Sequence, residues 1–163
     1  MIVQPQRKIF VLDTSVLIEL AIWLPIDLNN NFWSNLSANL QGGNWVLIDE
    51  VMHEIKKKYN PELKVWCDSK NQAGLVRAVM DEDRARGVAI NGLYTMIDTA
   101  TQRSTVDTYL IAFAERNGLT VFTREGGREK TGDPYKIPDV CTRLKIDWIR
   151  EPHVFFRAMG YKN

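Results

Sequence analysis

The sequence has few of the residues that bind soft metals or form covalent cross-links. Among its 163 residues are two cysteines and two histidines, and no two cysteines are spaced as in a Cys-x-x-Cys motif. Zinc sites draw their ligands mainly from closely spaced cysteines and histidines, and a disulfide framework needs several cysteines in an oxidising compartment. The sequence therefore predicts neither, and it favours the reducing cytoplasm.

Long apolar runs and an excess of charge of one sign are also absent. The apolar runs are far shorter than the roughly 20 residues of a membrane span, and Asp13 interrupts the first of them, so we expect no secretory signal and no membrane partner. With 21 Lys and Arg against 20 Asp and Glu, the net charge is +1. No global field therefore indicates a nucleic-acid partner, although a local basic patch is compatible with this balance.

Short apolar runs alternate with segments of helical spacing along most of the chain. Strands are predicted at 9–12, 45–48, 119–123 and 145–149, and helices at 16–21, 32–40, 50–59, 104–117, from 137 onward and at 152–159. This alternation is typical of an α/β fold with a largely parallel sheet. Since 163 residues suffice for one such domain with a proper core, we expect a single domain over residues 1–163.

Residues 61–103 have weaker patterns. Apolar spacing predicts one short helix near 63–67 and another over 75–80. The mixed-charge run at 81–86 is expected to end the second of these helices at Gly87, with further helix and loop over 88–101.

Four acidic residues occupy comparable places in this predicted layout. Asp13 directly follows the first strand, and Glu54 lies early in the helix after the second. Asp107 lies in the first turn of the helix before the third strand, and Glu125 lies just beyond that strand. In a parallel α/β sheet, the carboxyl ends of strands and the first turns of the following helices share one edge. We therefore expect Asp13, Glu54 and Glu125 to converge there, and Asp107 to join them if its helix begins on that edge.

A cluster of carboxylates without cysteine or histidine suits hard divalent cations. Mg²⁺ and Mn²⁺ prefer oxygen ligands, and Mg²⁺ commonly keeps waters and binds substrate phosphates as well. Two such ions about 4 Å apart can activate a water and stabilise the leaving oxygen in phosphodiester hydrolysis. The pattern thus points to phosphodiester chemistry with one or two metal ions as cofactors.

Each acid also has a purely structural interpretation. Asp13 could cap the first helix, and Glu54 could pair with the lysine one turn further on. Asp107 follows Ser104 at the spacing of a capping box, and Glu125 could be a solvated loop residue.

The segments that contain these acids resemble, in order and spacing, the four motifs of PIN domains. They are VLDTSVLI at 11–18, IDEVMHEI at 48–55, VDTYLIAFA at 106–114 and LTVFTRE at 119–125. Any one of these motifs is weak, but four in order are fairly specific. Residues 136–141 are similar to a segment of one uncharacterised PIN-like subfamily.

The resemblance implies a three-layer α/β/α sandwich with a mostly parallel sheet and Mg²⁺- or Mn²⁺-dependent cleavage of RNA. Many single-domain members are VapC-type toxins of toxin–antitoxin pairs, so an antitoxin and a homodimer are implied partners. By this resemblance the catalytic metal ligands are Asp13, Glu54, Asp107 and Glu125, supported by hydrogen bonds from Ser15 and Thr123. The fourth acid of the family is usually an aspartate, so Glu125, one methylene longer, departs from the pattern.

Basic residues near the second and fourth motifs are candidate phosphate contacts. They are Lys56, Lys57, Lys58 and Arg124. The structural alternative for the three lysines is a solvated helix end, where cations are favourable.

Two other functions fit the same pattern in part. One is a catalytically weak or inactive PIN-like module that binds RNA or a protein partner. The other is a phosphatase of the haloacid-dehalogenase type with Asp13 as nucleophile, but Ser15 stands where that family has its second aspartate, and we reject it. No GxxxxGK[ST] or GxGxxG motif occurs, which excludes P-loop and dinucleotide-binding functions.

Overall fold

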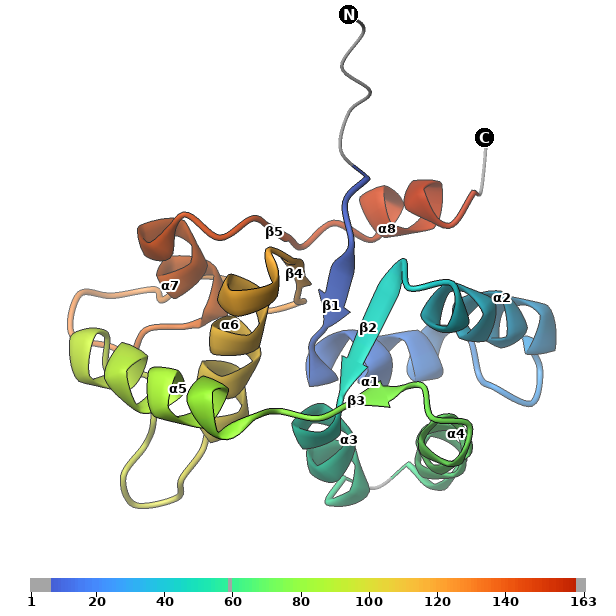
Figure 1. Ribbon diagram of the computed structural model, residues 1–163, viewed down its shortest axis with the longest axis horizontal. Helices are drawn as coiled ribbons and strands as arrows, with labels where there is room; N and C mark the ends of the chain where they lie inside the picture. The colour runs from blue at the N-terminus through green and yellow to red at the C-terminus, as the bar shows by residue number, and fades with distance from the viewer. Residues whose placement is uncertain (1–6, 59, 161–163) are drawn as a thin grey trace, which may run out of the picture.

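The computed structural model describes residues 7–58 and 60–160, and in these residues five parallel strands form one sheet (Figure 1). The order across the sheet is β3-β2-β1-β4-β5. The strands are β1 (Phe10–Leu12), β2 (Trp45–Ile48), β3 (Val76–Arg77), β4 (Thr120–Phe122) and β5 (Trp148–Ile149). The predicted α/β fold with a mostly parallel sheet is confirmed.

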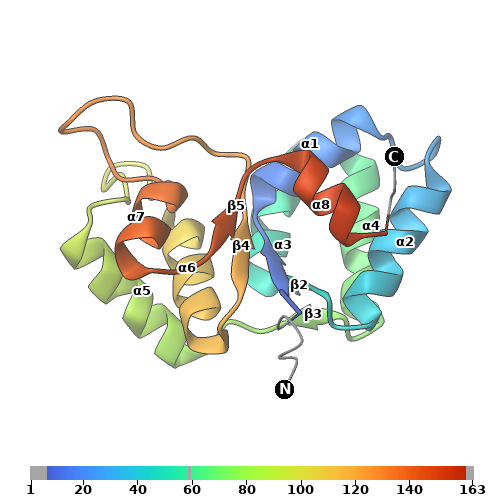
Figure 2. The same ribbon diagram turned by 90° about the horizontal axis from the view of Figure 1, so that it is seen from above.

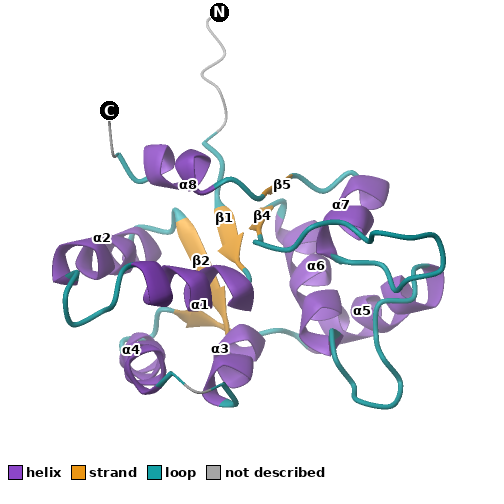
Figure 3. Ribbon diagram, turned by 180° about the vertical axis from the view of Figure 1, so that it is seen from behind, coloured by secondary structure: helices purple, strands orange, loops and turns teal. Residues whose placement is uncertain are grey.

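Eight helices in the described ranges cover this sheet. They are α1 (Thr14–Trp23), α2 (Asn30–Gln41), α3 (Asp49–Lys56), α4 (Pro61–Gln72), α5 (Asp81–Leu93), α6 (Thr105–Asn117), α7 (Ile137–Leu144) and α8 (Pro152–Ala158). Helices α5, α6 and α7 lie on one side of the sheet and α1, α2, α4 and α8 on the other (Figures 2 and 3), while α3 contacts α1, α4 and α6. The result is a three-layer α/β/α sandwich.

The three central strands are apolar runs that are buried on both faces. Every residue of β1, β2 and β4 is buried, and β1 pairs with both neighbours, Phe10 lying opposite Trp45 on one side and Thr120 on the other. Burial on both faces explains why these strands lack an alternating pattern. The outer strands β3 and β5 have two residues each and are partly exposed, so their sequence signal is weaker.

The prediction of a helix over 75–80 is wrong. Val76 and Arg77 form β3 and pair with the end of β2, and the Val79 amide donates a hydrogen bond of 3.0 Å to the Asp49 side chain. The apolar residues there are spaced as in a helix, but partners distant in the sequence determine their conformation.

The charged run at 81–86 begins a helix rather than ending one. Its acids lie in the first turn of α5, where negative charge is favourable, and Asp83 accepts a hydrogen bond from the Met80 amide. Gly87 lies in mid-helix because α6 packs closely there. A Cβ on Gly87 would approach the Tyr109 ring to 2.8 Å and the Thr108 hydroxyl to 3.0 Å.

Both cysteines are structural. Cys67 and Cys141 are free and buried, and burial raises the pKa of each thiol to about 12. Neither thiol is therefore an activated nucleophile.

None of the helices in the described ranges is long and apolar enough to cross a membrane.

Candidate metal centre

Asp13 lies at the carboxyl end of the central strand, in the interior of the protein. Its amide donates a hydrogen bond of 2.9 Å to the Phe122 carbonyl, which joins the end of β1 to the end of β4. It precedes α1 in extended conformation, yet its side chain makes no capping hydrogen bond to that helix. The carboxylate is 3 % exposed. The side-chain cap considered for Asp13 is therefore not formed.

Two hydroxyl groups hold the Asp13 carboxylate instead. Ser15 and Thr123 donate to the same oxygen, Oδ2, at 2.6 and 2.8 Å. The same hydroxyl oxygens accept hydrogen bonds from the Arg124 amide at 3.0 Å and the Glu125 amide at 3.1 Å. These bonds tie Asp13 directly to the segment that contains Glu125.

Glu54 lies in the second turn of α3 and is partly buried. Its Oε2 accepts a hydrogen bond from the buried Thr14 hydroxyl at 2.5 Å. Within the described residues it forms no ion pair, so the predicted alternative of a pair with Lys58 is wrong. The role of Thr14 was missed from the sequence, because a hydroxyl residue after a strand is most simply interpreted as a helix cap.

Asp107 lies in the first turn of α6 and is 8 % exposed. Ser104, directly before this helix, has a left-handed backbone with φ of 66° and makes no side-chain capping bond, so the capping box considered for this pair is not formed. The Ser104 side chain lies near the Asp107 carboxylate and lowers the pKa of that acid. A non-glycine residue in this conformation costs of order 1 kcal/mol and points to a local constraint.

Glu125 lies in the segment that follows β4 and is partly buried. Its Oε2 accepts a hydrogen bond of 3.4 Å from the Ile137 amide at the start of α7. The solvated loop position considered for this residue is therefore not what the structure shows.

The charges of these acids act on one another. Burial, and after it the charges of Asp13 and Glu125, hold the pKa of Asp107 well above its usual value. Burial also raises the pKa of Asp13, against the hydroxyl hydrogen bonds that lower it, and the Glu54 charge raises it further. Burial and the Asp13 charge raise the pKa of Glu125. The expected convergence at one edge of the sheet is therefore present.

Comparison with known families places the chain in one of them. The sequence model of a domain of unknown function, DUF4411, matches residues 10–162, which include all four acids. The chain belongs to the DUF4411 family. No curated protein matches the sequence.

None of the four acids of this DUF4411 chain is ion-paired with a cation of the described residues. In the described ranges, no lysine, arginine or histidine lies within 4.0 Å of any of the four carboxylates, whereas seven other ion pairs occur. Buried acids that repel one another and lack a counter-charge are stabilised by a bound cation. An all-oxygen donor set fits Mg²⁺ or Mn²⁺ in its chemistry.

The arrangement is not closed around a single point. Among the residues that the structure describes, no three acidic, cysteine or histidine side chains are close enough together to hold a metal ion as they stand. Three of these side chains could share one cation only after moving closer together, and the partial exposure of Glu54 and Glu125 leaves them room to do so.

Two of the expected phosphate contacts are engaged elsewhere. Arg124 forms an ion pair of 2.6 Å with Glu19 and lies over the Trp23 ring. Lys56 forms an ion pair of 2.8 Å with Asp68. Lys57 and Lys58 are exposed and form no ion pair within the described ranges.

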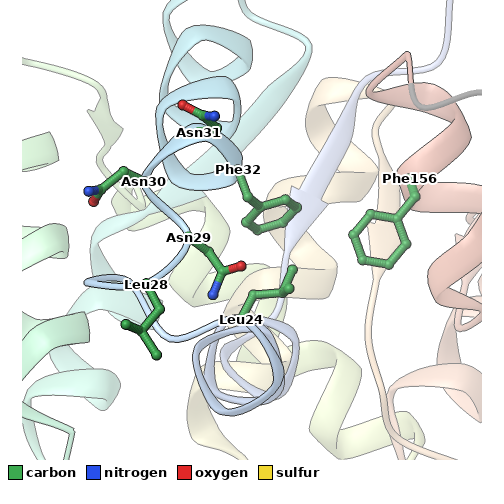
Figure 4. Close-up of a pocket in the computed structure, with 7 residues that line it drawn as sticks. All are labelled: Leu24, Leu28, Asn29, Asn30, Asn31, Phe32 and Phe156. Atoms are coloured by element: carbon green, nitrogen blue, oxygen red, sulfur yellow. The ribbon is translucent and has the colours of Figure 1, made fainter.

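A cavity of about 620 Å³ lies away from the acids, where the end of α1 and the start of α2 face α8 (Figure 4). Leu24, Phe32 and Phe156 make much of its wall apolar, and the adjacent Asn29–Asn31 segment is polar. None of the described residues that line it is titratable, and none of them belongs to the acidic centre.

Proposed function

We propose that this DUF4411 protein is a Mg²⁺- or Mn²⁺-dependent endoribonuclease that hydrolyses RNA phosphodiester bonds. One observation carries the proposal. Four carboxylates from four distant segments lie near one another at the carboxyl edge of a parallel sheet, and no cation of the described residues forms an ion pair with them. That edge is where parallel α/β proteins place their ligand sites.

The residues that would hold the metal are Asp13, Glu54, Asp107 and Glu125. A bound divalent ion supplies an activated water and charge stabilisation at the phosphate. Ser15, Thr123 and Thr14 orient two of the carboxylates through their hydrogen bonds. Fixed orientation matters because a ligand displaced by a fraction of an ångström loses affinity and activity.

The raised pKa values support this proposal through competition. An acid whose pKa is raised by burial and by neighbouring charges takes up protons more readily, and a metal ion competes with those protons for the same oxygens. We therefore expect metal affinity to increase with pH until Asp107 and Glu125 are ionised.

The second candidate is a PIN-like module that binds RNA or a protein without cleaving it. It is favoured by the open arrangement of the acids, none of whose triplets is positioned to hold an ion without movement. A toxin role, with an antitoxin and a homodimer as partners, is supported by the resemblance to PIN domains.

One experiment separates the candidates. We expect the intact protein to cleave RNA with Mg²⁺ or Mn²⁺, EDTA to stop cleavage, and Asp13→Ala or Asp107→Asn to abolish it. The control is Asp147→Asn, which removes an exposed acid that lies before β5, at the amino edge of the sheet. RNA binding without cleavage by the intact protein, with either metal and several RNAs, would favour the second candidate. Full activity in both acid variants would refute the assigned site.

A further inference from the structure

A second feature of the carboxyl edge is a cavity of about 480 Å³ beside Glu125. It lies between the loop that precedes α6 and the loop that precedes α7. Glu125 and Ser104 form its boundary with the acidic centre, and Met96 and Tyr135 contribute apolar and aromatic surface. Two exposed cations, Arg103 and Lys136, also line it.

Other acids line this cavity too, but two of them already accept hydrogen bonds from the backbone. Asp98 accepts from the Ala100 and Thr101 amides at 2.8 and 3.2 Å. Asp133 accepts from the Lys130 amide at 3.0 Å. These two aspartates stabilise the conformations of the two loops. The third acid, Glu129, is exposed to solvent.

The loop before α6 holds Arg103 in a constrained conformation. The residues on either side of it, Gln102 and Ser104, have positive φ angles of 56° and 66° although neither is glycine. The loop also closes on itself, since the Asp98 amide donates to the Arg103 carbonyl at 3.3 Å. Such outliers persist where the surroundings enforce them, and they concentrate at binding and active sites.

Both cations are available to a ligand. Neither Arg103 nor Lys136 forms an ion pair within 4.0 Å in the described parts of the chain, in contrast to Arg124 and Lys56. Lys136 lies near enough to Glu125 for its charge to lower the pKa of that acid. Arg103 lies near Asp98, whose pKa its charge lowers, and both cations line the cavity that Glu125 borders.

We infer that Arg103 and Lys136 form a phosphate-binding rim, which holds the RNA phosphates next to the one that is cleaved. The inference rests on the proposed function, because it assigns the substrate strand to this side of the acids. Acids that bind a metal would repel the strand without such a rim, and phosphate contacts of this kind fix the position of a nucleic acid without reading its sequence.

The test compares two double variants with the same change in net charge. Arg103→Ala/Lys136→Ala removes the rim. Lys8→Ala/Arg157→Ala removes two exposed cations near the amino edge of the sheet, where the start of β1 and α8 lie (Figure 1). Binding of a fluorescein-labelled single-stranded RNA is measured by anisotropy at several salt concentrations, in an Asp13→Asn background that does not cleave.

We expect the rim variant to bind about tenfold more weakly at low salt, and its slope of log affinity against log salt to be shallower by about 1.4, that is, about 0.7 for each lost contact. The control pair changes neither by more than about twofold. In the otherwise intact protein, the rim variant raises KM for the same RNA and leaves kcat unchanged, as expected for lost uniform binding. The single variant Arg103→Lys, with Lys136 in place, keeps most of the RNA affinity that the double rim variant loses.

Equal affinity and equal slope in the two double variants would overturn the rim. If the intact protein cleaves RNA in that case, the proposed nuclease stands and the strand runs elsewhere. If the intact protein binds RNA through the rim without cleaving it, the rim stands and the proposed nuclease fails. Absence of any RNA binding in the Asp13→Asn background overturns the rim outright.

Discussion

Two buried aspartates occupy the first turns of adjacent helices and have opposite surroundings. Asp83 in α5 is 1 % exposed, and both its oxygens accept from the Arg116 guanidinium, at 2.6 and 2.7 Å. The Met80 amide donates a further hydrogen bond to it. Asp107 in α6 is almost as buried but has acids as its charged neighbours.

The two pKa values move in opposite directions as a result. Although burial works to raise it, the hydrogen bonds from Arg116 and Met80 leave the pKa of Asp83 below its usual value. Burial and the charges of Asp13 and Glu125 raise that of Asp107. Asp83 is thus neutralised by Arg116, whereas the charges that act on Asp107 are those of other acids, and the proposed metal ion would supply the missing counter-charge. Sites that bind or react are often less stable than they could be for this reason.

The strongest test of this contrast is Asp107→Asn, which should separate activity from stability. We expect RNA cleavage to fall by about 10²-fold or more, because a group that binds the metal is lost. We also expect the free energy of unfolding at pH 7 to rise by roughly 0.5–2 kcal/mol, because an unpaired buried charge is removed. Urea titration and single-turnover cleavage on the same preparation measure both. A destabilised, fully active variant would contradict the assignment.

The matched change Asp83→Asn should give the reverse result. It removes a charged acceptor whose partner remains, so we expect a loss of about 2 kcal/mol in the free energy of unfolding. Cleavage per folded molecule stays unchanged at a temperature well below the transition. If activity falls as steeply as in Asp107→Asn while the fold persists, Asp83 acts on the site, and the contrast between the two aspartates fails.

The sequence predicted the elements that depend on local runs of residues. Strand β2 has the predicted bounds, and Asp13, Asp107 and Glu125 follow or precede strands whose burial on both faces is visible as an unbroken apolar run. Their convergence then follows from the topology of parallel sheets alone. Burial and parallel pairing are strong constraints, so the edge of the sheet could be predicted without knowing any contact.

What could not be predicted depends on partners far apart in the chain. Asp83 belongs to the charged run that was expected to end a helix, whereas it lies buried in the first turn of α5 and pairs with Arg116, 33 residues on. Gly87 looked like a helix stop, but α6 packs against it. Arg124 was expected to bind phosphate, but in the structure it forms an ion pair with Glu19. Periodicity contains no information on such pairs, so the sequence could not show that Arg124 already has a partner.

A smaller effect should come from the metal itself. We expect Mn²⁺ at about ten times its dissociation constant to raise the free energy of unfolding by about 1.4 kcal/mol, because it binds the folded acids only. The same concentration should stabilise Asp83→Asn equally and Asp107→Asn much less. Calorimetric or fluorescence melting with Mn²⁺, and with Na⁺ at equal ionic strength as the control, measures this. Equal stabilisation of the three proteins would place the bound ion away from Asp107.

The smallest effect is the pH dependence of the Asp107→Asn gain. Because the pKa of Asp107 is raised in the folded state, the folded protein holds a proton that the unfolded chain releases above the usual value of 3.8. The contribution of Asp107 to the free energy of unfolding is therefore fully present below about pH 4 and is lost as pH rises through the pKa of the folded state. The advantage of Asp107→Asn should vanish near pH 4 and grow as pH rises from there through the folded pKa of Asp107. Asp83 has the opposite sign, since its contribution is lost only as pH falls below 3.8 through its lowered folded pKa. Urea titrations of the unchanged protein, Asp107→Asn and Asp83→Asn across this range measure both dependences. A gain in Asp107→Asn that stays constant with pH would mean that an opposite charge already neutralises Asp107 in the folded protein. Its surroundings would then resemble those of Asp83.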